Sequence, residues 1–195
     1  MPGQRDHDSR IQGFLDWVNQ NCSNGTLDIK LGPEHPFMPA RVVEDYFKDL
    51  RRVIALLDAL FSRQVESPHH LVHIIQRKFC RVFAISLSSN MGEFIETFIH
   101  HDIHDQKLPF TDRPSHFPTA TDGSDLWESF YDAQWRFCSP RFERNMNPQY
   151  PTNRILPIVE RELLDEEGNC SKVYKIRLHG THNDLGPSGR TDTVR

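Results

Sequence analysis

The sequence predicts a mainly α protein, in which a helical bundle precedes a C-terminal β-hairpin. Two observations support this fold class. Apolar residues recur at every third or fourth position through much of residues 36–143, as they do on the buried face of a helix. After Pro140 the pattern changes to the every-second-residue alternation that is typical of strands. We therefore expect an N-terminal segment with one short helix (1–35), the bundle (36–143), the hairpin (150–182) and a disordered tail (183–195).

Two helices are predicted in the first third of the chain. Ser9 suits the N-cap of a short helix, after a polar stretch (1–8) that reads as disordered. A Pro-rich connection (31–39) leads to the strongest helical pattern, residues 39–63. Pro39 fits its first turn, where a missing N–H costs nothing. The stripe of this long helix is Val43, Phe47, Leu50, Ile54, Leu57 and Phe61.

Three further helices complete the predicted bundle. Ser67 and Pro68 are expected to start the first of them, which runs to about Leu87. Its stripe is Val72, Ile75, Phe79, Val82 and Phe83. Another begins near Met91, and a loop follows it (106–123). The last helix is capped by Ser124 or Asp125 and carries Trp127, Tyr131 and Trp135 on one row.

The two predicted strands have the sequences "ILPIVERELL" (155–164) and "KVYKIRLH" (172–179), joined by "DEEGNCS". An isolated two-stranded hairpin is only marginally stable in water, so this one must pack against something else. If it does not, Val173 and Ile176 are apolar side chains at risk of association.

Composition limits the function classes. A net charge of −4 gives no support for a nucleic-acid partner, which requires a basic face. No apolar run approaches the roughly 20 residues that span a bilayer, so no membrane partner is expected. The first ten residues lack the apolar core of a signal peptide. We expect a cytoplasmic or nuclear protein that is not secreted, with its four cysteines as free thiols.

The segment "GNCSKVYKI" resembles the glycine-rich loop and second strand of eukaryotic-type protein kinases. Over about residues 40–185 the chain is similar to a fungal protein-kinase-like family, in which a helical region precedes the start of a kinase small lobe. The motifs that carry this resemblance are "FCRVFAISLSSNMGEFIETFI", "LPF", "QWRFC" and "ILPIVERELL" with "VYKIRLH". The family activity is ATP-dependent serine/threonine phosphorylation with ATP and magnesium as cofactors.

The resemblance implies that Gly168, Ser171 and Val173 are the remains of a nucleotide loop, with Val173 against the base. Glu166 stands where the family has its first glycine, and its charge opposes phosphate. No lysine follows Lys175, and no H-R-D, D-F-G or A-P-E motif is present. We therefore expect a truncated, pseudokinase-like relative that lacks catalytic residues and needs no cofactor of its own.

Other groups of residues allow alternative sites. "HHDIHD" (100–105) places His100 and His104 four residues apart, a spacing that binds zinc on a helix, but a solvated helix end is favoured over a metal site. Cys80 and Cys138 fit buried positions better than nucleophiles. The aromatic row of residues 127–135 fits a core or an interface better than a ligand platform.

Two functions remain open. The chain is either an incomplete protein-kinase relative or a non-catalytic helical interaction or regulatory module. In the second case, a protein partner is expected to bind the exposed hairpin or a helical face.

Overall fold

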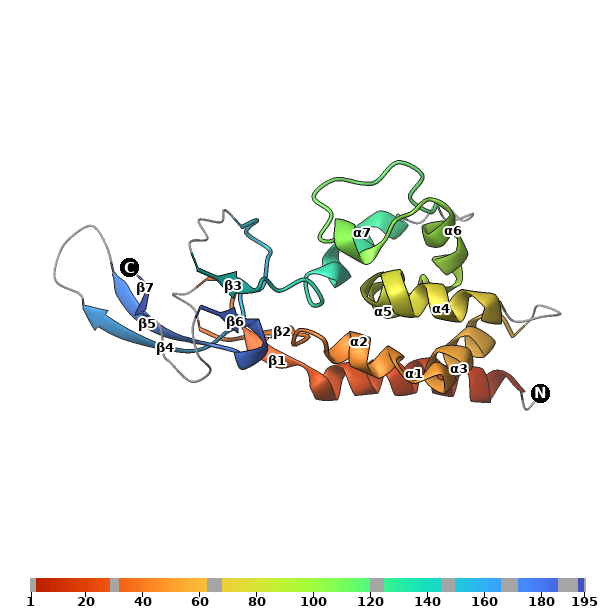
Figure 1. Ribbon diagram of the computed structural model, residues 1–195, viewed down its shortest axis with the longest axis horizontal. Helices are drawn as coiled ribbons and strands as arrows, with labels where there is room; N and C mark the ends of the chain where they lie inside the picture. The colour runs from red at the N-terminus through yellow and green to blue at the C-terminus, as the bar shows by residue number, and fades with distance from the viewer. Residues whose placement is uncertain are drawn as a thin grey trace. The chain divides into compact units, whose positions relative to one another are not determined.

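The computed structural model describes residues 3–28, 32–62, 68–119, 125–144, 150–165, 172–185 and 193–194. It is mostly helical with a small antiparallel hairpin toward the C-terminus, which confirms the predicted fold class (Figure 1). The chain forms two compact units. The helical unit comprises Met1–Asn21 and Arg41–Phe137, and the strand unit comprises Cys22–Ala40 and Cys138–Arg195. The predicted divisions at residues 35 and 143 differ from these, because the 22–40 segment pairs with the C-terminal part of the chain.

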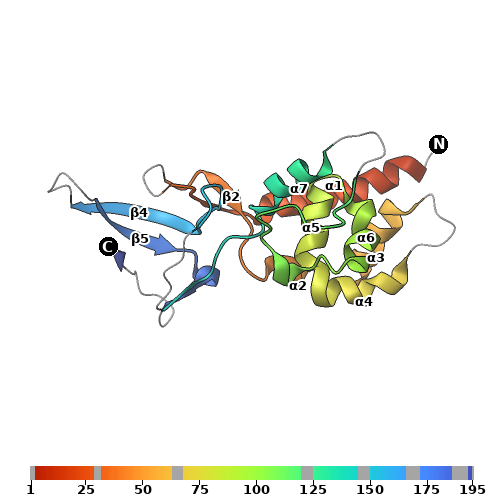
Figure 2. The ribbon, with the colours of Figure 1, turned by 90° about the horizontal axis from the view of Figure 1, so that it is seen from above.

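The helical unit is built around α5, whose residues 82–87 are all buried. Helices α1, α2, α6 and α7 each contact α5, and Figure 2 shows α5 among them. The α-helices of this unit are α1 (Gly3–Asn21), α2 (Val42–Phe47), α3 (Leu50–Leu60), α4 (Val72–Ile74), α5 (Cys80–Ser88), α6 (Ile95–His100) and α7 (Leu126–Gln134). Its shorter elements are the 3₁₀ turns η1 (His69–Leu71), η3 (Gly92–Phe94) and η4 (Asp105–Lys107), and the π-helical η2 (Ile75–Phe79).

Helix α1 begins earlier than predicted. It starts at Gly3, so Ser9 lies inside the helix and the expected disorder of residues 1–8 is wrong from Gly3 onward. The apolar stripe reveals only the part of a helix that packs, here through buried Phe14 and Val18. The first residues of α1 have no apolar stripe, so the sequence pattern did not indicate that they are helical.

The single long helix predicted over residues 39–63 is also wrong, because it is broken between α2 and α3. Asp49 has extended backbone angles (φ −77°, ψ 106°) and accepts a hydrogen bond from the Arg51 N–H at 3.0 Å. It is therefore the N-cap of a new helix. Pro39 precedes α2 rather than opening it, and Arg41 holds a left-handed conformation (φ 69°) at the N-cap of α2.

The remaining helices follow the predicted pattern closely. The predicted stripe of η2 and α5 is buried throughout. Asp125 caps α7 by accepting from the Trp127 N–H at 3.0 Å, as predicted. Pro68 occupies the N-cap position of η1 instead of its first turn, and Ser67 and Ser124 lie outside the described residues.

The strand unit contains one strand within the predicted Pro-rich connection (31–39) and another strand before it. β1 (Ser23–Gly25) and β2 (His35–Phe37) pair antiparallel. Thr26 then forms an isolated antiparallel bridge to Leu156, with N···O distances of 2.9 and 2.7 Å. Gly25 is required at this crossing, because a Cβ there would lie 2.3 Å from the Leu156 carbonyl oxygen.

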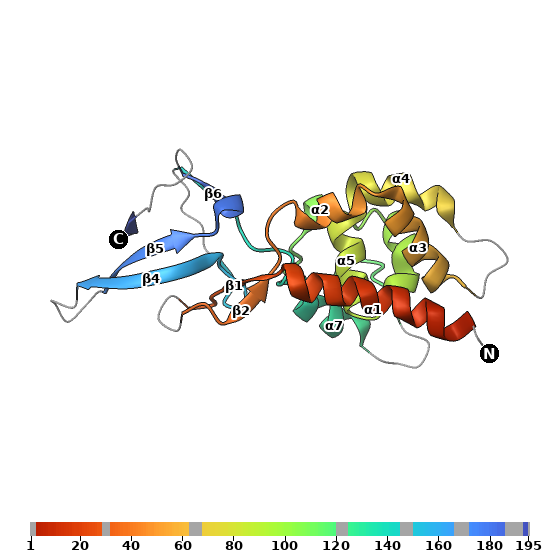
Figure 3. The same ribbon diagram turned by 90° about the horizontal axis from the view of Figure 1, so that it is seen from below.

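The predicted hairpin is present as β4 (Ile158–Asp165) and β5 (Val173–Leu178) (Figure 3). β7 (Thr193–Val194) adds to it in the order β4-β5-β7 (Figure 1). Its first strand starts three residues later than predicted, after Pro157. One side is buried and formed by Ile158, Ile176 and Leu178. Ile176 is therefore packed and is not an exposed apolar side chain.

The other side of the hairpin is charged and paired across the strands. Lys175 Nζ lies 3.1 Å from Glu162 Oε2, and Arg177 Nε donates to Glu160 Oε2 at 2.7 Å. Because these side chains are exposed, each pair contributes little to stability. They do fix which face of the hairpin turns to solvent.

Part of the predicted tail is ordered. After η5 (Gly180–His182), β6 (Asn183–Asp184) pairs in parallel with β3 (Phe142–Glu143). His182 is buried, and its Nε2 accepts from the Ala40 N–H at 2.9 Å while Nδ1 lies 2.8 Å from the Pro140 carbonyl oxygen. One side chain thus joins both chain segments of the strand unit. Among the described residues, no helix is both long enough and apolar enough to cross a membrane.

Candidate functional site

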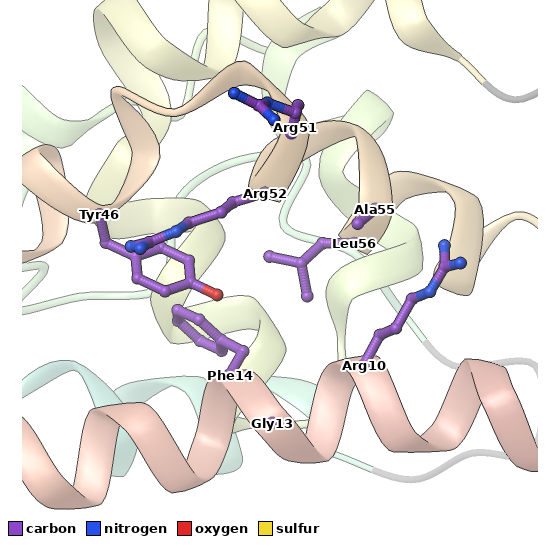
Figure 4. Close-up of a pocket in the computed structure, with 8 residues that line it drawn as sticks. All are labelled: Arg10, Gly13, Phe14, Tyr46, Arg51, Arg52, Ala55 and Leu56. Carbon is purple, nitrogen blue, oxygen red and sulfur yellow. The ribbon is translucent and has the colours of Figure 1, made fainter.

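A pocket of about 320 Å³ opens between α1 and the α2–α3 pair of the helical unit (Figure 4). Its walls come from the middle of α1, the last turns of α2 and the first half of α3. The lining residues are Arg10, Gly13, Phe14, Tyr46, Arg51, Arg52, Ala55 and Leu56. This combination of an apolar floor and basic side chains makes the pocket the candidate site.

The floor is fixed by the core of the unit. Phe14 and Leu56 are 1% and 2% exposed. The Phe14 ring stacks on Phe47 at a centroid distance of 5.7 Å and meets the edge of Tyr46 at 5.3 Å. Closely packed rings of this kind hold a preformed apolar surface.

Three arginines line the pocket. The Arg51 side chain is 95% exposed and points away from the apolar floor, whereas Arg10 and Arg52 lie beside the floor (Figure 4). Arg10 comes from α1, and Arg51 and Arg52 come from the first turn of α3. The Asp49 carboxylate lies 3.9 Å from Arg51 Nε and 3.8 Å from Arg52 Nε. One carboxylate cannot balance three cations, and the N-terminal end of α3 adds partial positive charge. The rim therefore has a positive potential.

Tyr46 connects the rim with the floor. Arg52 lies over its ring at 4.5 Å, and the Trp17 ring packs beside it at 4.2 Å. Burial raises the pKa of the Tyr46 hydroxyl; the charge of Arg52 lowers it and that of Asp49 raises it. The hydroxyl remains protonated at neutral pH, so it can donate a hydrogen bond to an acceptor in the pocket.

Gly13 leaves the α1 wall open. A Cβ built at this position meets no heavy atom within 4 Å. Figure 4 places Gly13 on the α1 wall, between the Phe14 and Arg10 side chains that reach toward α3. A larger residue at this position would occupy part of the pocket.

The predicted nucleotide loop is described only in part. Gly168 and Ser171 lie outside the described residues, as does Glu166. Val173 is the first residue of β5, half-buried and paired opposite Asp165. The pocket residues and this hairpin belong to different units.

The histidine pair that suggested zinc does not share a helix. Helix α6 ends at His100, and His104 instead caps η4 by accepting from the Gln106 N–H. The rings of His100, His101 and His116 do gather, with two centroid distances of 4.7 Å. Within the described ranges, no three His, Cys, Asp or Glu side chains are placed to hold a metal ion.

Two further groups are structural. Asp105 accepts from the Arg81 and Val82 N–H groups at 3.0 and 2.9 Å, and so caps α5 where the π-helical segment ends. Burial raises the pKa of the neighbouring Cys80 thiol to about 12, and the charges of Asp105 and Glu44 raise it too. Because only the thiolate is nucleophilic, Cys80 is a buried packing residue, as predicted.

The aromatic row of α7 covers the core. Consecutive rings of Trp127, Tyr131 and Trp135 lie 5.4 Å apart. Trp127 also packs edge-on against buried Phe117 at 5.1 Å, and Trp135 is itself buried. This arrangement agrees with the core interpretation rather than a ligand platform.

The sequence analysis did not identify Arg10, Arg51 or Arg52. One local signal was available in "DLRR" (49–52), where an N-cap aspartate precedes two arginines in a first turn. Cations in that position are unfavourable for the helix itself. That Arg10 joins them depends on α1 packing against α3, which no local pattern predicts. Comparisons of the chain with family models, curated proteins and solved structures gave no match.

Proposed function

We propose that the chain is a non-catalytic binding module whose helical unit receives an acidic, partly apolar group of a partner in the α1–α3 pocket. The observation that carries this proposal is the set of three arginines around a buried apolar floor. A guanidinium binds carboxylates through paired hydrogen bonds. The neighbouring apolar part of the partner would rest on the half-buried Tyr46 and Ala55.

The size of the pocket limits what it accepts. At about 320 Å³ it lies at the lower end of the roughly 300–1,000 Å³ typical of ligand pockets. It suits one apolar side chain next to a carboxylate better than a whole nucleotide. Exposed arginine–carboxylate pairs contribute only about 0–1 kcal/mol each, so the apolar contact must supply much of the affinity. A weak, transient peptide interaction follows.

The test is a titration of the full chain with a peptide of alternating glutamate and leucine whose two ends are chemically blocked. Backbone amide shifts of the protein are followed by NMR. We expect saturable shifts of amides in α1 and α3, and none with a peptide in which lysine replaces glutamate. Gly13→Leu, which fills the pocket, and Arg52→Glu should abolish the shifts. Arg77→Glu, an exposed arginine of η2 outside the pocket, should leave them intact. Equal binding of both peptides, or binding that survives Arg52→Glu, would refute the proposal.

We propose as a second candidate that the chain is a relative of the fungal protein-kinase-like family with a degenerate nucleotide loop. The supporting observation is the antiparallel β4–β5 hairpin, with Val173 at the start of β5. The resemblance of "GNCSKVYKI" to a kinase loop adds to it. Binding of ATP is the direct test, and its expected outcome is given in the Discussion.

We further propose a reducing compartment, the cytoplasm or the nucleus. The support is Cys80, a free thiol in the core of the helical unit. Immunofluorescence of the tagged full chain would test this, and a secreted product would refute it.

A further inference from the structure

We propose that the occupant of the α1–α3 pocket is a second copy of this chain, which inserts the end of its β4 strand, Leu163 and Leu164. This inference rests on the function proposed above, because it uses the same pocket. It adds the identity of the partner and predicts that the chain self-associates.

The inserted segment is exposed and apolar. Leu163 and Leu164 are 37% and 48% exposed, and Leu164 has the largest exposed fraction among the large apolar side chains of the described residues. They stand near the end of β4, which is an outer strand in the order β4-β5-β7. The register shifts here, because Leu163 pairs with Tyr174 and Asp165 pairs with the adjacent Val173, so Leu164 is the extra residue of a β-bulge. In the proposed contact, Leu164 enters the pocket and Leu163 covers its rim.

The charges of the two surfaces are opposite. In the sequence Asp165, Glu166 and Glu167 follow the leucines directly, which gives a run of three acids. The pocket has three arginines and one nearby carboxylate. A leucine followed by acids is the apolar-plus-acidic group that the pocket suits. Complementary charge speeds the encounter and sets the orientation.

The other exposed apolar side chains are not followed by acidic residues. Leu50 is followed by Arg51 and Arg52, so its surroundings have the charge of the pocket itself. Ile74 lies on α4 beside His73 and Ile75, without an acidic run. The end of β4 is therefore the apolar surface of the described residues that best matches the pocket.

The symmetry of the contact follows from the two different surfaces that it joins. The inserted segment and the pocket are different surfaces, so each copy offers one of each. Such a heterologous contact either closes, as a reciprocal pair or a ring, or continues into an open chain. In every case the weight-average mass of the particles must rise with the concentration of the protein. High salt should weaken the association, because exposed charges are screened.

Sedimentation velocity of the full chain tests the proposal. We expect the weight-average mass to rise above 22.8 kDa between micromolar and millimolar concentration, and to fall back in high salt. Leu163→Ser with Leu164→Ser should keep the chain monomeric. Because both leucines are exposed, this variant should keep wild-type helix content by circular dichroism. Ile74→Ser is the matched control, and it should associate like the wild type.

A charge exchange makes the test specific. Arg51→Glu with Arg52→Glu should be monomeric, and so should Asp165→Lys with Glu166→Lys and Glu167→Lys. Mixed together, the two variants should associate again, because the unaltered segment of the first meets the unaltered pocket of the second, and the reversed segment of the second meets the reversed rim of the first. Failure of the mixture to associate would refute the proposal.

The outcomes separate this inference from the function on which it rests. If the glutamate–leucine peptide binds the pocket while the chain remains monomeric at every concentration, the inference fails and the proposed function stands. A chain that associates equally well with both leucines replaced also contradicts the inference. If neither the peptide nor the arginine substitutions have any effect, both fail.

Discussion

The side-chain amide of Gln134 pairs with both backbone groups of Phe110. The Phe110 N–H donates to Gln134 Oε1 at 2.8 Å, and Gln134 Nε2 donates to the Phe110 carbonyl oxygen at 3.0 Å. Gln134 is fully buried at the end of α7, and Phe110 lies in the loop between η4 and α7. The amide thus takes the place of a neighbouring strand and satisfies a buried stretch of loop backbone.

Replacing Gln134 should destabilise the helical unit strongly. Gln134→Leu keeps a similar volume but leaves the Phe110 N–H and carbonyl unsatisfied. Each lost partner costs about 1–3 kcal/mol, so a loss of about 2–5 kcal/mol is expected in urea unfolding. The exposed Gln106→Leu is the control and should change the free energy of unfolding by less than about 0.5 kcal/mol. Near-wild-type stability of Gln134→Leu would show that the loop finds other partners.

Two glycines should respond in opposite ways to alanine. Gly13→Ala adds a Cβ to open space within α1, so it should stabilise the chain by about 0.5–1 kcal/mol. Gly92→Ala places a Cβ 2.7 Å from Leu60 Cδ2 and 3.0 Å from Leu87 Cδ2, and should destabilise it by about 1–3 kcal/mol. Thermal unfolding of both variants measures the difference. Equal changes in melting temperature for the two variants would contradict the close packing of the Leu60 and Leu87 side chains around Gly92.

The His182 hydrogen bond should depend on pH. Burial lowers the pKa of His182 below its usual 6.5; the Pro140 bond opposes this, and the charges of His179 and Arg141 add to it. Between the lowered pKa and 6.5 the unfolded chain binds more protons than the folded one, so stability is complete above this window and falls as the pH drops through it.

The Ala40 amide reports this change directly, because its N–H needs the unprotonated Nε2 of His182. We expect its hydrogen-exchange protection, corrected for intrinsic rates, to fall as the pH drops from 6.5 through the lowered pKa of His182. In His182→Gln the protection should be lower at neutral pH and nearly independent of pH. Protection that is constant with pH in the wild type would contradict the neutral, accepting role of His182.

Loss of the Asp105 carboxylate should weaken the start of α5. Asp105→Ala removes the acceptor of the Arg81 and Val82 N–H groups, which should cost about 1–3 kcal/mol. Asp112→Ala, an exposed aspartate of the loop between η4 and α7, is the comparison and should cost less. Chemical denaturation measures both. Equal costs would show that these N–H groups do not depend on Asp105.

ATP with magnesium should not raise the melting temperature of the chain. Of the three glycines in the kinase loop that this segment resembles, the sequence has only Gly168, and the charges of Glu166 and Glu167 oppose phosphate binding. Thermal unfolding with increasing ATP measures this. A saturable rise of several degrees would revive the nucleotide-binding interpretation.

The sequence predicted correctly those features that depend on residues close together in the chain. The Asp125 cap, the buried stripe of η2 and α5 and the alternation along β5 are all encoded within a few residues, and all are confirmed. The break at Asp49 was also encoded locally, but the continuous apolar stripe from α2 into α3 concealed it.

Features that depend on distant residues could not be predicted. β2 lies within the predicted Pro-rich connection (31–39) and β1 precedes it, and the bridge from Thr26 to Leu156 forms only when the chain has folded. The pocket likewise needs Arg10 from one helix and Arg52 from another. Side-chain periodicity says which face is buried, not which partner buries it.

The division of the chain has a consequence for its synthesis. β1 and β2 leave the ribosome early, yet Leu156 and His182, which hold them in place, follow more than a hundred positions later in the sequence. The helical unit can fold as soon as Phe137 has been synthesised. At that stage residues 22–40 do not yet have their C-terminal pairing partners. The helical unit can therefore become native while the strand unit is still incomplete. Cleavage at any single peptide bond divides at least one of the two units between the fragments.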